Sequence, residues 1–345
     1  MPETEKQVEI HAAVTADCDL LYHYTSTEGL LGIIEQDNIR ATHVRFLNDW
    51  TEFREAFTEK YVPILVDSFR AGLPKDFDEA AERVLSRRRP EILGIIESSG
   101  STNETFVCSF TESVGAATQD GGDPGDRLSQ WRGYAHSSEG FSLGFDKNLL
   151  KKQIEKLNGQ KSKASLLECI YSDDEKISFF QELGRTAAAR FNDRRRSSAP
   201  VFSSFKTAIP NASEEDKRLK SDFLVSLSGA TAKFFTTAPR IKHSGFREEV
   251  EWRVIFQACH DWLFPEVVKF RKGQFGPTPF IEIPLGLAKP ETSSLRRIVV
   301  GPSTHKEDIK HSVKLLLRKH RIPVREPGIN NGVDVTTSVI PYRSG

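Results

Sequence analysis

The stretch FREEVEWRVIF, residues 246–256, decides the fold class, because it carries the clearest strand pattern in the chain. Apolar and charged side chains alternate along it, as in a strand that packs one face against a core. The predicted apolar face holds Phe246, Val250, Trp252, Val254 and Phe256. The predicted charged face holds Arg247, Glu249, Glu251 and Arg253. Strand geometry then places the two glutamate carboxylates on one face, about 7 Å apart.

Further strand patterns recur without a regular alternation of strands and helices, which favours a mixed or antiparallel sheet. Strands are expected at residues 19–24, 105–112, 140–146, 166–173, 280–285, 294–302 and near 335–343. Helical spacing of apolar residues predicts helices at 26–37, from 49 to about 70, and at 75–99, 147–157 and 304–320. We therefore predict one α+β domain over residues 1–345, with a helical insertion at residues 175–235.

The bulk composition narrows the functional class. Lysine plus arginine equals aspartate plus glutamate, 48 each, which argues against a protein that coats duplex DNA by charge alone. The four cysteines are far apart and form no C-x-x-C pair, which argues against a zinc site or a disulfide framework. No apolar run is long enough to cross a bilayer and the first residues are charged, so we expect a cytoplasmic protein without a membrane partner.

A histidine stands at a predicted strand-to-helix junction in LYHYTSTEGLLGII, residues 21–34. Thr25 precedes Glu28 by three positions, which is the spacing of a capping box that opens a helix. Backbone amides and a partial positive charge gather at a helix start, so His23 is well placed to contact an anionic or hydroxylated ligand. The alternative is a buried histidine that bonds a backbone carbonyl while Tyr22 and Tyr24 pack around it.

The two glutamates of the late strand repel each other, so they need a cation, a ligand hydroxyl or a raised pKa in one of them. Arg253 or Arg247 can supply the cation. The alternative is a solvent-facing strip with a surface ion pair, which contributes little stability.

Aromatic residues supply the other candidates. Trp131 and Tyr134 lie in SQWRGY beside the glycine-rich loop at 118–126, where their rings can form a slot for a planar ligand. The alternative is a packed turn in which Trp131 fills the core. Ser109, in the strand at 105–112, can bind a ligand or be structural.

These motifs resemble a bacterial family of uncharacterised domains. The shared pattern consists of HYTS, LND, SQWRGY with GFD, an E-x-EWR strand and IPYR. In this chain they are residues 23–26, 47–49, 129–134 with 144–146, 249–253 and 340–343. The resemblance spans nearly the whole chain.

More distantly, the chain resembles the ADP-ribosyltransferase superfamily, which includes bacterial toxins that modify DNA bases. The resemblance implies a sheet core of that type with NAD bound as a substrate and no metal. His23, Tyr24 and Thr25 match the histidine motif, although Tyr24 replaces a small residue. Ser109, Trp131 and Tyr134 are the candidates for the second motif. Glu251 matches the late catalytic glutamate and Glu249 precedes it by two residues.

The chemistry implied by this resemblance is cleavage of NAD through an oxocarbenium-like ribose, which a facing carboxylate stabilises. We expect an ADP-ribosyltransferase that modifies a nucleic acid or protein acceptor, in phage defence or as a toxin. Two alternatives remain. One is an NAD glycohydrolase with water as acceptor, and the other is a non-catalytic module that binds a ligand or nucleic acid on the same fold.

Overall fold

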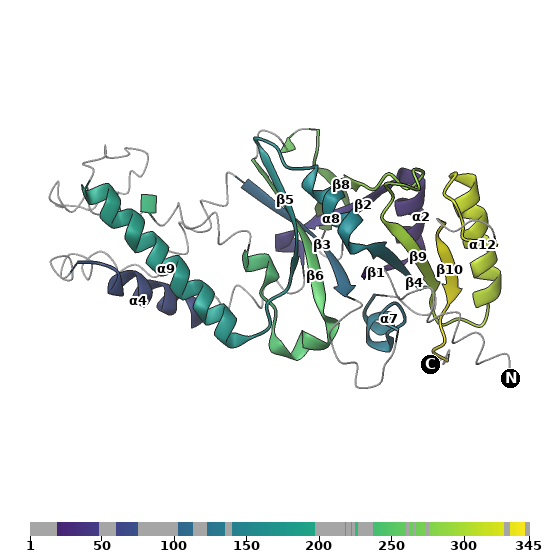
Figure 1. The fold of residues 1–345 in the computed structure, drawn as a ribbon, viewed down its shortest axis with the longest axis horizontal. Helices are drawn as coiled ribbons and strands as arrows, with labels where there is room; N and C mark the ends of the chain where they lie inside the picture. The colour runs from purple at the N-terminus through teal and green to yellow at the C-terminus, as the bar shows by residue number, and fades with distance from the viewer. Residues whose placement is uncertain are drawn as a thin grey trace.

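The chain forms an α+β fold with a mixed, open sheet (Figure 1). The computed structural model describes residues 19–47, 60–74, 103–112, 123–134, 140–196, 218, 222, 225–226, 237–259, 263–264, 266–273, 276–327 and 332–341. The strands are β1 (Leu20–Ser26), β2 (Asn38–His43), β3 (Asn103–Glu112), β4 (Gly140–Asp146), β5 (Ser162–Glu168), β6 (Glu251–Cys259), β7 (Lys269–Gly273), β8 (Gly276–Pro284), β9 (Leu295–Val300) and β10 (Asp334–Thr337).

Some helices pack against this sheet and others project away from it (Figure 1). The α-helices are α2 (Thr27–Gln36), α4 (Val62–Ala71), α7 (Leu128–Tyr134), α8 (Lys147–Glu155), α9 (Asp173–Arg196) and α12 (Lys306–Lys319). The 3-10 helices are η1 (Val44–Phe46), η6 (Ala238–Arg240) and η7 (Ser244–Glu249). Among the described residues, no helix has the length and apolar character needed to cross a membrane.

Strand β3 is central to the sheet, because it pairs with β6, β1 and β2. One edge of β3 pairs with β6 from end to end, and β6 pairs in turn with β5. The other edge is divided between β1, through Leu21 and Tyr22, and β2, through Thr42 and His43. Residues 108–110 lie between these two ladders, so β1 and β2 diverge there. Beyond β1 the order is β4, β9, β10, and beyond β2 it is β8, β7.

Apolar residues cover both faces of the β1 side of the sheet. The larger core lies under α2, α8 and α12, whose buried residues include Ile34, Leu150 and Leu317. A smaller cluster lies under α7 on the opposite face; it consists of Leu20, Tyr22, Tyr24, Trp131 and Val299, with Ile340 packed against it. Successive residues of β1 point to opposite faces, so Leu21 enters the first cluster while Tyr22 and Tyr24 enter the second.

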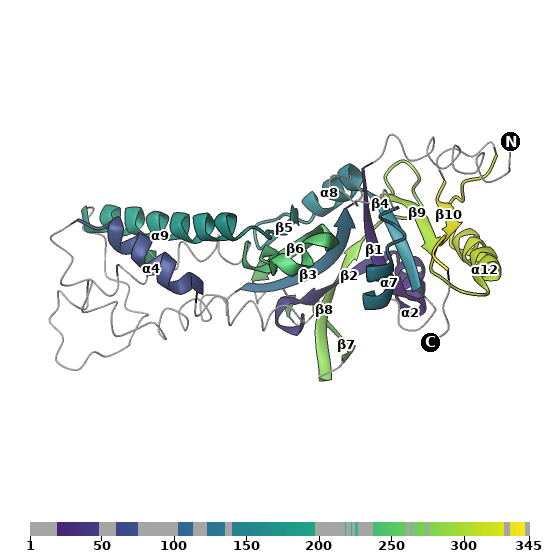
Figure 2. The ribbon, with the colours of Figure 1, turned by 90° about the horizontal axis from the view of Figure 1, so that it is seen from below.

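Helices α4 and α9 form an arm that projects away from the sheet (Figures 1 and 2). Tyr61 stacks on Phe180 at a centroid distance of 4.6 Å, and Phe69 meets Phe191 edge to face at 5.9 Å. Within the predicted helical insertion at 175–235, α9 covers the first part, and most of the rest lies outside the described residues. The pairing of α9 with α4, from a much earlier segment, was not predicted.

Most predicted elements are present with shifted ends, but three expectations were wrong. Residues 246–249 belong to η7, and Val250 adopts a left-handed backbone (φ 43°), so β6 begins at Glu251. Alternation of residue types cannot reveal such a kink, which is rare for a β-branched residue. Ser26, rather than Thr25, caps α2 by accepting a hydrogen bond from the Gly29 N–H. The strand predicted at 166–173 lies at Ser162–Glu168. The predicted helix at 75–99 lies outside the described residues.

The closest approach within the arm generates a first prediction. A Cβ atom added to Gly184 would lie 2.4 Å from the Leu65 carbonyl oxygen and 2.9 Å from the Phe69 nitrogen, both backbone atoms. Gly184→Ala should therefore separate α4 from α9 and lower the free energy of unfolding by about 1–3 kcal/mol. Urea denaturation measures the loss, and hydrogen exchange should locate it in the arm.

The matched control is Gly133→Ala in α7, where the added methyl meets no atom within 4 Å. Alanine is favoured over glycine in a helix by about 0.5–1 kcal/mol, so this variant should be at least as stable as the parent. Equal stability of the two variants would contradict the tight helix packing.

Candidate functional site

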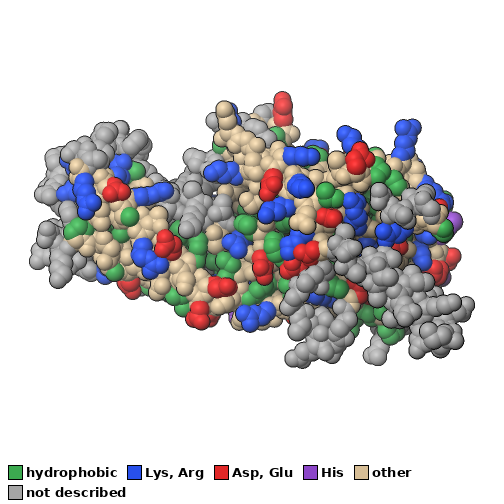
Figure 3. All heavy atoms as spheres, viewed as in Figure 1, with side chains coloured by type: hydrophobic (Ala, Val, Ile, Leu, Met, Phe, Trp, Pro, Cys, Tyr) green, Lys and Arg blue, Asp and Glu red, His purple; other side chains and the backbone are tan. Residues whose placement is uncertain are grey.

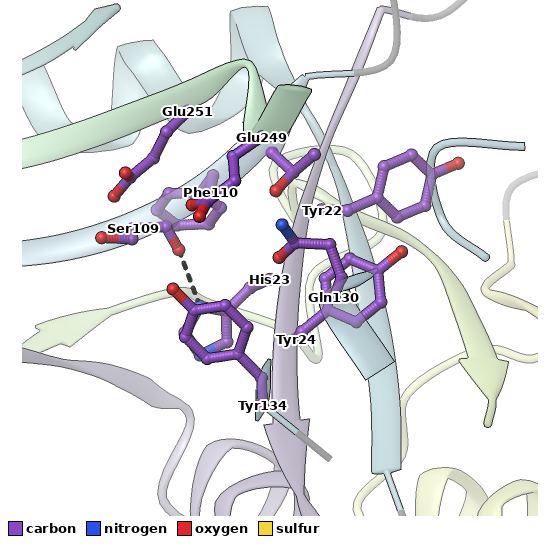
Figure 4. Close-up of a pocket in the computed structure, with 10 residues that line it drawn as sticks. Tyr22, His23, Tyr24, Ser109, Phe110, Gln130, Tyr134, Glu249 and Glu251 are labelled. Atoms are coloured by element: carbon purple, nitrogen blue, oxygen red, sulfur yellow. Dashed lines mark hydrogen bonds between the residues drawn. The ribbon is translucent and has the colours of Figure 1, made fainter. Parts of the chain in front are cut away.

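One pocket brings together most of the residues that the sequence predicts for a site (Figure 4). Six of them line it: His23, Tyr24, Ser109, Tyr134, Glu249 and Glu251. Thr25 and Trp131 do not. Tyr22, Phe110, Thr111 and Gln130 also line the pocket and were not predicted. Gln130 and Tyr134 are spaced by one helical turn on α7, a signal that could have identified Gln130 once SQWRGY was taken as a helix rather than a turn.

The pocket lies where β1 leaves β3. It encloses about 60 Å³. A single buried water needs roughly 10–15 Å³ on this scale, so the pocket has room for a group of a few heavy atoms. A larger ligand can place one end in it, with the remainder outside.

His23 closes the gap between β1 and β3. Its Nδ1 donates to the Ser109 carbonyl at 2.9 Å, which requires the proton on Nδ1 and leaves Nε2 as an acceptor. The ring also lies 5.6 Å from that of Phe110. Burial lowers the pKa of His23, while the bond to Ser109 opposes the shift, so the imidazole is neutral near pH 7. The carbonyl contact that the alternative interpretation expected is thus present, and Nε2 can still contact a ligand.

Tyr24 contributes its ring rather than its hydroxyl. The hydroxyl donates to the Pro124 carbonyl at 2.7 Å and accepts from the Arg127 N–H at 3.0 Å. Figure 4 shows this hydroxyl and that of Tyr22 directed away from the space between His23 and Glu249. Tyr24 is therefore a wall of the pocket. Thr25 pairs with Phe141 of β4 beyond that wall.

Helix α7 separates the roles of its two aromatic residues. Trp131 is buried, meets the Tyr24 ring edge to face at 4.8 Å, and donates Nε1–H to Asp126 at 2.7 Å. It fills the core, as the alternative interpretation expected. Tyr134 is 44% exposed and lines the same pocket as His23 (Figure 4).

Two residues before α7 fix its position. Asp126 accepts from the Ser338 hydroxyl at 2.5 Å as well as from Trp131, so it ties the helix to the end of the described chain. Arg127 donates to the carbonyls of Glu248 and Glu112 at 3.0 and 3.4 Å. The helix is thereby held against β3 and against η7, the two segments that complete the pocket.

Glu251 is a buried carboxylate held by two cations. Its side chain accepts from Arg253 Nε at 2.7 Å, from Arg253 Nη2 at 3.1 Å and from Lys242 Nζ at 2.6 Å. Burial acts to raise the pKa of Glu251, but Arg253 and Lys242 outweigh it and lower the pKa to about 2. The alternative of a solvent-facing ion pair is therefore wrong, because Glu251 and Arg253 are 3% and 4% exposed. Of the two predicted cations, Arg253 is the one that pairs.

Lys242 links the two glutamates and was not predicted. Its Nζ lies 2.6 Å from Glu249 as well as from Glu251. Burial disfavours the charge on Lys242, but the carboxylates, Glu251 foremost, raise its pKa. Although Glu249 lies outside β6, Lys242 holds its carboxylate beside that of Glu251. The cluster contains two carboxylates and two cations, so its charges balance.

Trp252 lies on the opposite face of β6. It packs against the larger core, donates Nε1–H to Glu112 at 2.9 Å and lies under the Lys147 ammonium. The expected orientation of this strand, with Trp252 and Glu251 on opposite faces, is therefore correct from Glu251 onward.

Comparison with known proteins adds a family resemblance and no activity. Residues 130–254 match a family described as a protein of unknown function (DUF2971). This match supports the resemblance to a family of uncharacterised domains, and it runs from within α7 to within β6. No curated protein matches the chain. No solved structure matches it either.

The carboxylate of Glu251 should make stability depend on pH. Its pKa is lowered from 4.5 to about 2 in the folded state, so its contribution is fully present above about pH 5 and is lost as the pH falls toward 2. At pH 7, Glu251→Gln should reduce the free energy of unfolding by about 3 kcal/mol, because it leaves two buried cations without their carboxylate.

Urea unfolding of parent and variant between pH 7 and pH 3 measures this dependence. The difference between them should shrink as the pH falls, since protonated Glu251 resembles glutamine. Glu248→Gln, on the exposed side of η7, is the matched control and should differ little from the parent at any pH. A Glu251→Gln difference that stays constant with pH would exclude the ionised network.

Proposed function

We propose that this protein is an NAD-dependent ADP-ribosyltransferase that transfers ADP-ribose to a nucleic acid or protein acceptor. One observation carries the proposal. His23 of the first strand and Glu251 of the sixth, far apart in sequence, line the same pocket together with Glu249. The distant superfamily resemblance assigns its site to a histidine and a glutamate in these two positions.

The reaction needs a fixed negative charge. The glycosidic bond between the ribose and nicotinamide breaks, and nicotinamide leaves with the electron pair, so positive charge develops on the ribose. Glu251 is ionised at any pH near neutrality, and its geometry is fixed by Arg253 and Lys242. A preorganised carboxylate of this kind stabilises the cation without reorganising during the reaction.

The other residues have roles that suit their contacts. His23 can accept a ribose hydroxyl at Nε2, since Nδ1 is engaged by Ser109. The exposed ring of Tyr134 can stack on a planar group. Glu249 has a side chain 17% exposed, which lets it receive the proton of the acceptor as the new bond to the ribose forms.

The surface charge of the protein does not select one class of acceptor. Figure 3 shows positive and negative side chains interspersed over the face that it draws, in line with the net charge of zero. Broad electrostatic capture of duplex DNA is therefore not part of the proposal. A role in phage defence or as a toxin fits transfer to either a nucleic acid or a protein.

A non-catalytic binding module is the second candidate. Arg253 and Lys242 donate to both oxygens of Glu251, which is also how a purely structural buried carboxylate is satisfied. An NAD glycohydrolase would use the same cleavage with water as acceptor.

Incubation with NAD labelled on the adenylate phosphate, in the presence of DNA, RNA or cell lysate, separates these functions. Label on a macromolecule supports transfer, and free ADP-ribose alone indicates a glycohydrolase. Glu249→Gln should reduce acceptor labelling by about 10²-fold or more, the scale of general-base catalysis, and reduce NAD cleavage less. Glu248→Gln is the control, because it changes the same residue type in the same helix and removes the same charge. It should transfer label to the acceptor at the parent rate. A parent that binds NAD without cleaving it would reject the enzyme.

His23 provides a second test, because its two nitrogens have different partners. His23→Asn places an amide N–H where Nδ1–H was and removes Nε2, so the bond to Ser109 can persist. NAD affinity should fall by about tenfold, the scale of one lost hydrogen bond in a buried site, with little change in melting temperature. Calorimetric titration and thermal unfolding on the same sample measure both. Unchanged affinity in a folded His23→Asn would assign the histidine to structure alone.

A further inference from the structure

Gln130 brings to the pocket a side-chain amide that makes no hydrogen bond within the part of the chain that the structure describes. It is 4% exposed and lines the pocket. Figure 4 shows its amide directed into the space shared with His23 and Glu249. Because the amide makes no bond to the described protein, both its N–H₂ donor and its oxygen acceptor are available to a ligand in the pocket.

The position of Gln130 is fixed by its helix. The next residue, Trp131, is buried in the smaller apolar cluster under α7 and bonded to Asp126. Tyr134, one turn later, shares the pocket face. The helix therefore presents the Gln130 amide and the Tyr134 ring on the same face. The bond from Trp131 to Asp126 keeps the helix from rotating this face away from the pocket.

The charge around this amide limits what it can bind. The carboxylates of Glu249 and Glu251 line the pocket, their partners Lys242 and Arg253 are not among its lining residues, and His23 is neutral. Although the cluster as a whole is balanced, an anionic group that entered would face the two carboxylates and not their cations, and like charges disfavour each other. A neutral group with one donor and one acceptor would instead satisfy the amide fully.

We propose that Gln130 is a specificity-determining residue that pairs with an uncharged carboxamide on a planar ring and rejects the corresponding carboxylate. The amide N–H₂ donates to the carboxamide oxygen and the amide oxygen accepts from its N–H₂, while Tyr134 covers the ring. This inference rests on the proposed function in that nicotinamide is the part of NAD with this chemistry. The pocket volume of about 60 Å³ suits the carboxamide end of such a ring rather than a dinucleotide.

Two matched pairs of small probes test the selection without requiring catalysis. Nicotinamide is compared with nicotinate, and benzamide with benzoate, by saturation-transfer NMR and calorimetric titration at pH 7. Both amides should bind at least tenfold more tightly than the acids. Gln130→Met keeps the length of the side chain and removes its donor and acceptor, so it should weaken both amides about tenfold. Gln36→Met, at the exposed end of α2, is the control and should bind as the parent does.

The outcomes separate this inference from the proposed function. Equal binding of amides and acids, no binding of either amide, or unchanged amide binding in a folded Gln130→Met would overturn the role of Gln130. Should Gln130→Met fail to fold, the comparison of amides with acids on the parent chain still decides the selection. NAD cleavage by a parent chain that does not discriminate would leave the proposed function standing. Discrimination without any NAD cleavage would support the role of Gln130 and reject the enzyme.

Discussion

The site depends on one hydrogen bond, from His23 to the Ser109 carbonyl, between strands β1 and β3 at the point where they diverge. Beyond Tyr22, β1 leaves β3, and the backbone of β3 between its two ladders needs another partner. The imidazole of His23 supplies it by donating to the Ser109 carbonyl. A buried carbonyl without a partner would be costly, so this side chain allows the sheet to split without that loss. The space left beside the bond is the pocket, which is why a histidine with a structural contact also lines a candidate site.

The remaining walls reach the pocket by separate means. Helix α7 is fixed through Asp126 and Arg127 to segments before and after it. The glutamates come from the junction of η7 and β6, where the left-handed backbone of Val250 turns the chain. Although this turn takes Glu249 out of the strand, Lys242 keeps the two carboxylates together, because its Nζ lies 2.6 Å from each of them. A buried cluster of this kind is a specific arrangement more than a source of net stability, since desolvation offsets much of its attraction.

The arm formed by α4 and α9 has its own packing interface, and its residues do not line the pocket. Its two helices approach so closely at Gly184 that their backbones are in contact. Aromatic pairs along the same interface stabilise the contact. The sheet and its pocket are built from other segments, and no residue of α4 or α9 lines the pocket.

The sequence by itself determined the class of the fold and most of the residues of the pocket. Alternation predicted β3, β4 and β9, and residue type and chain order selected His23, Tyr134 and Glu251, because strand periodicity and capping are local properties. Only the tertiary structure decided which of them meet. The kink at Val250, the bridging role of Lys242 and the burial of Trp131 depend on contacts between distant segments. Gln130 shares the pocket with Tyr134 because both lie on the face of α7 that lines it. Helical spacing relates these two residues to each other, but contacts with distant segments decide which face of a short helix is covered.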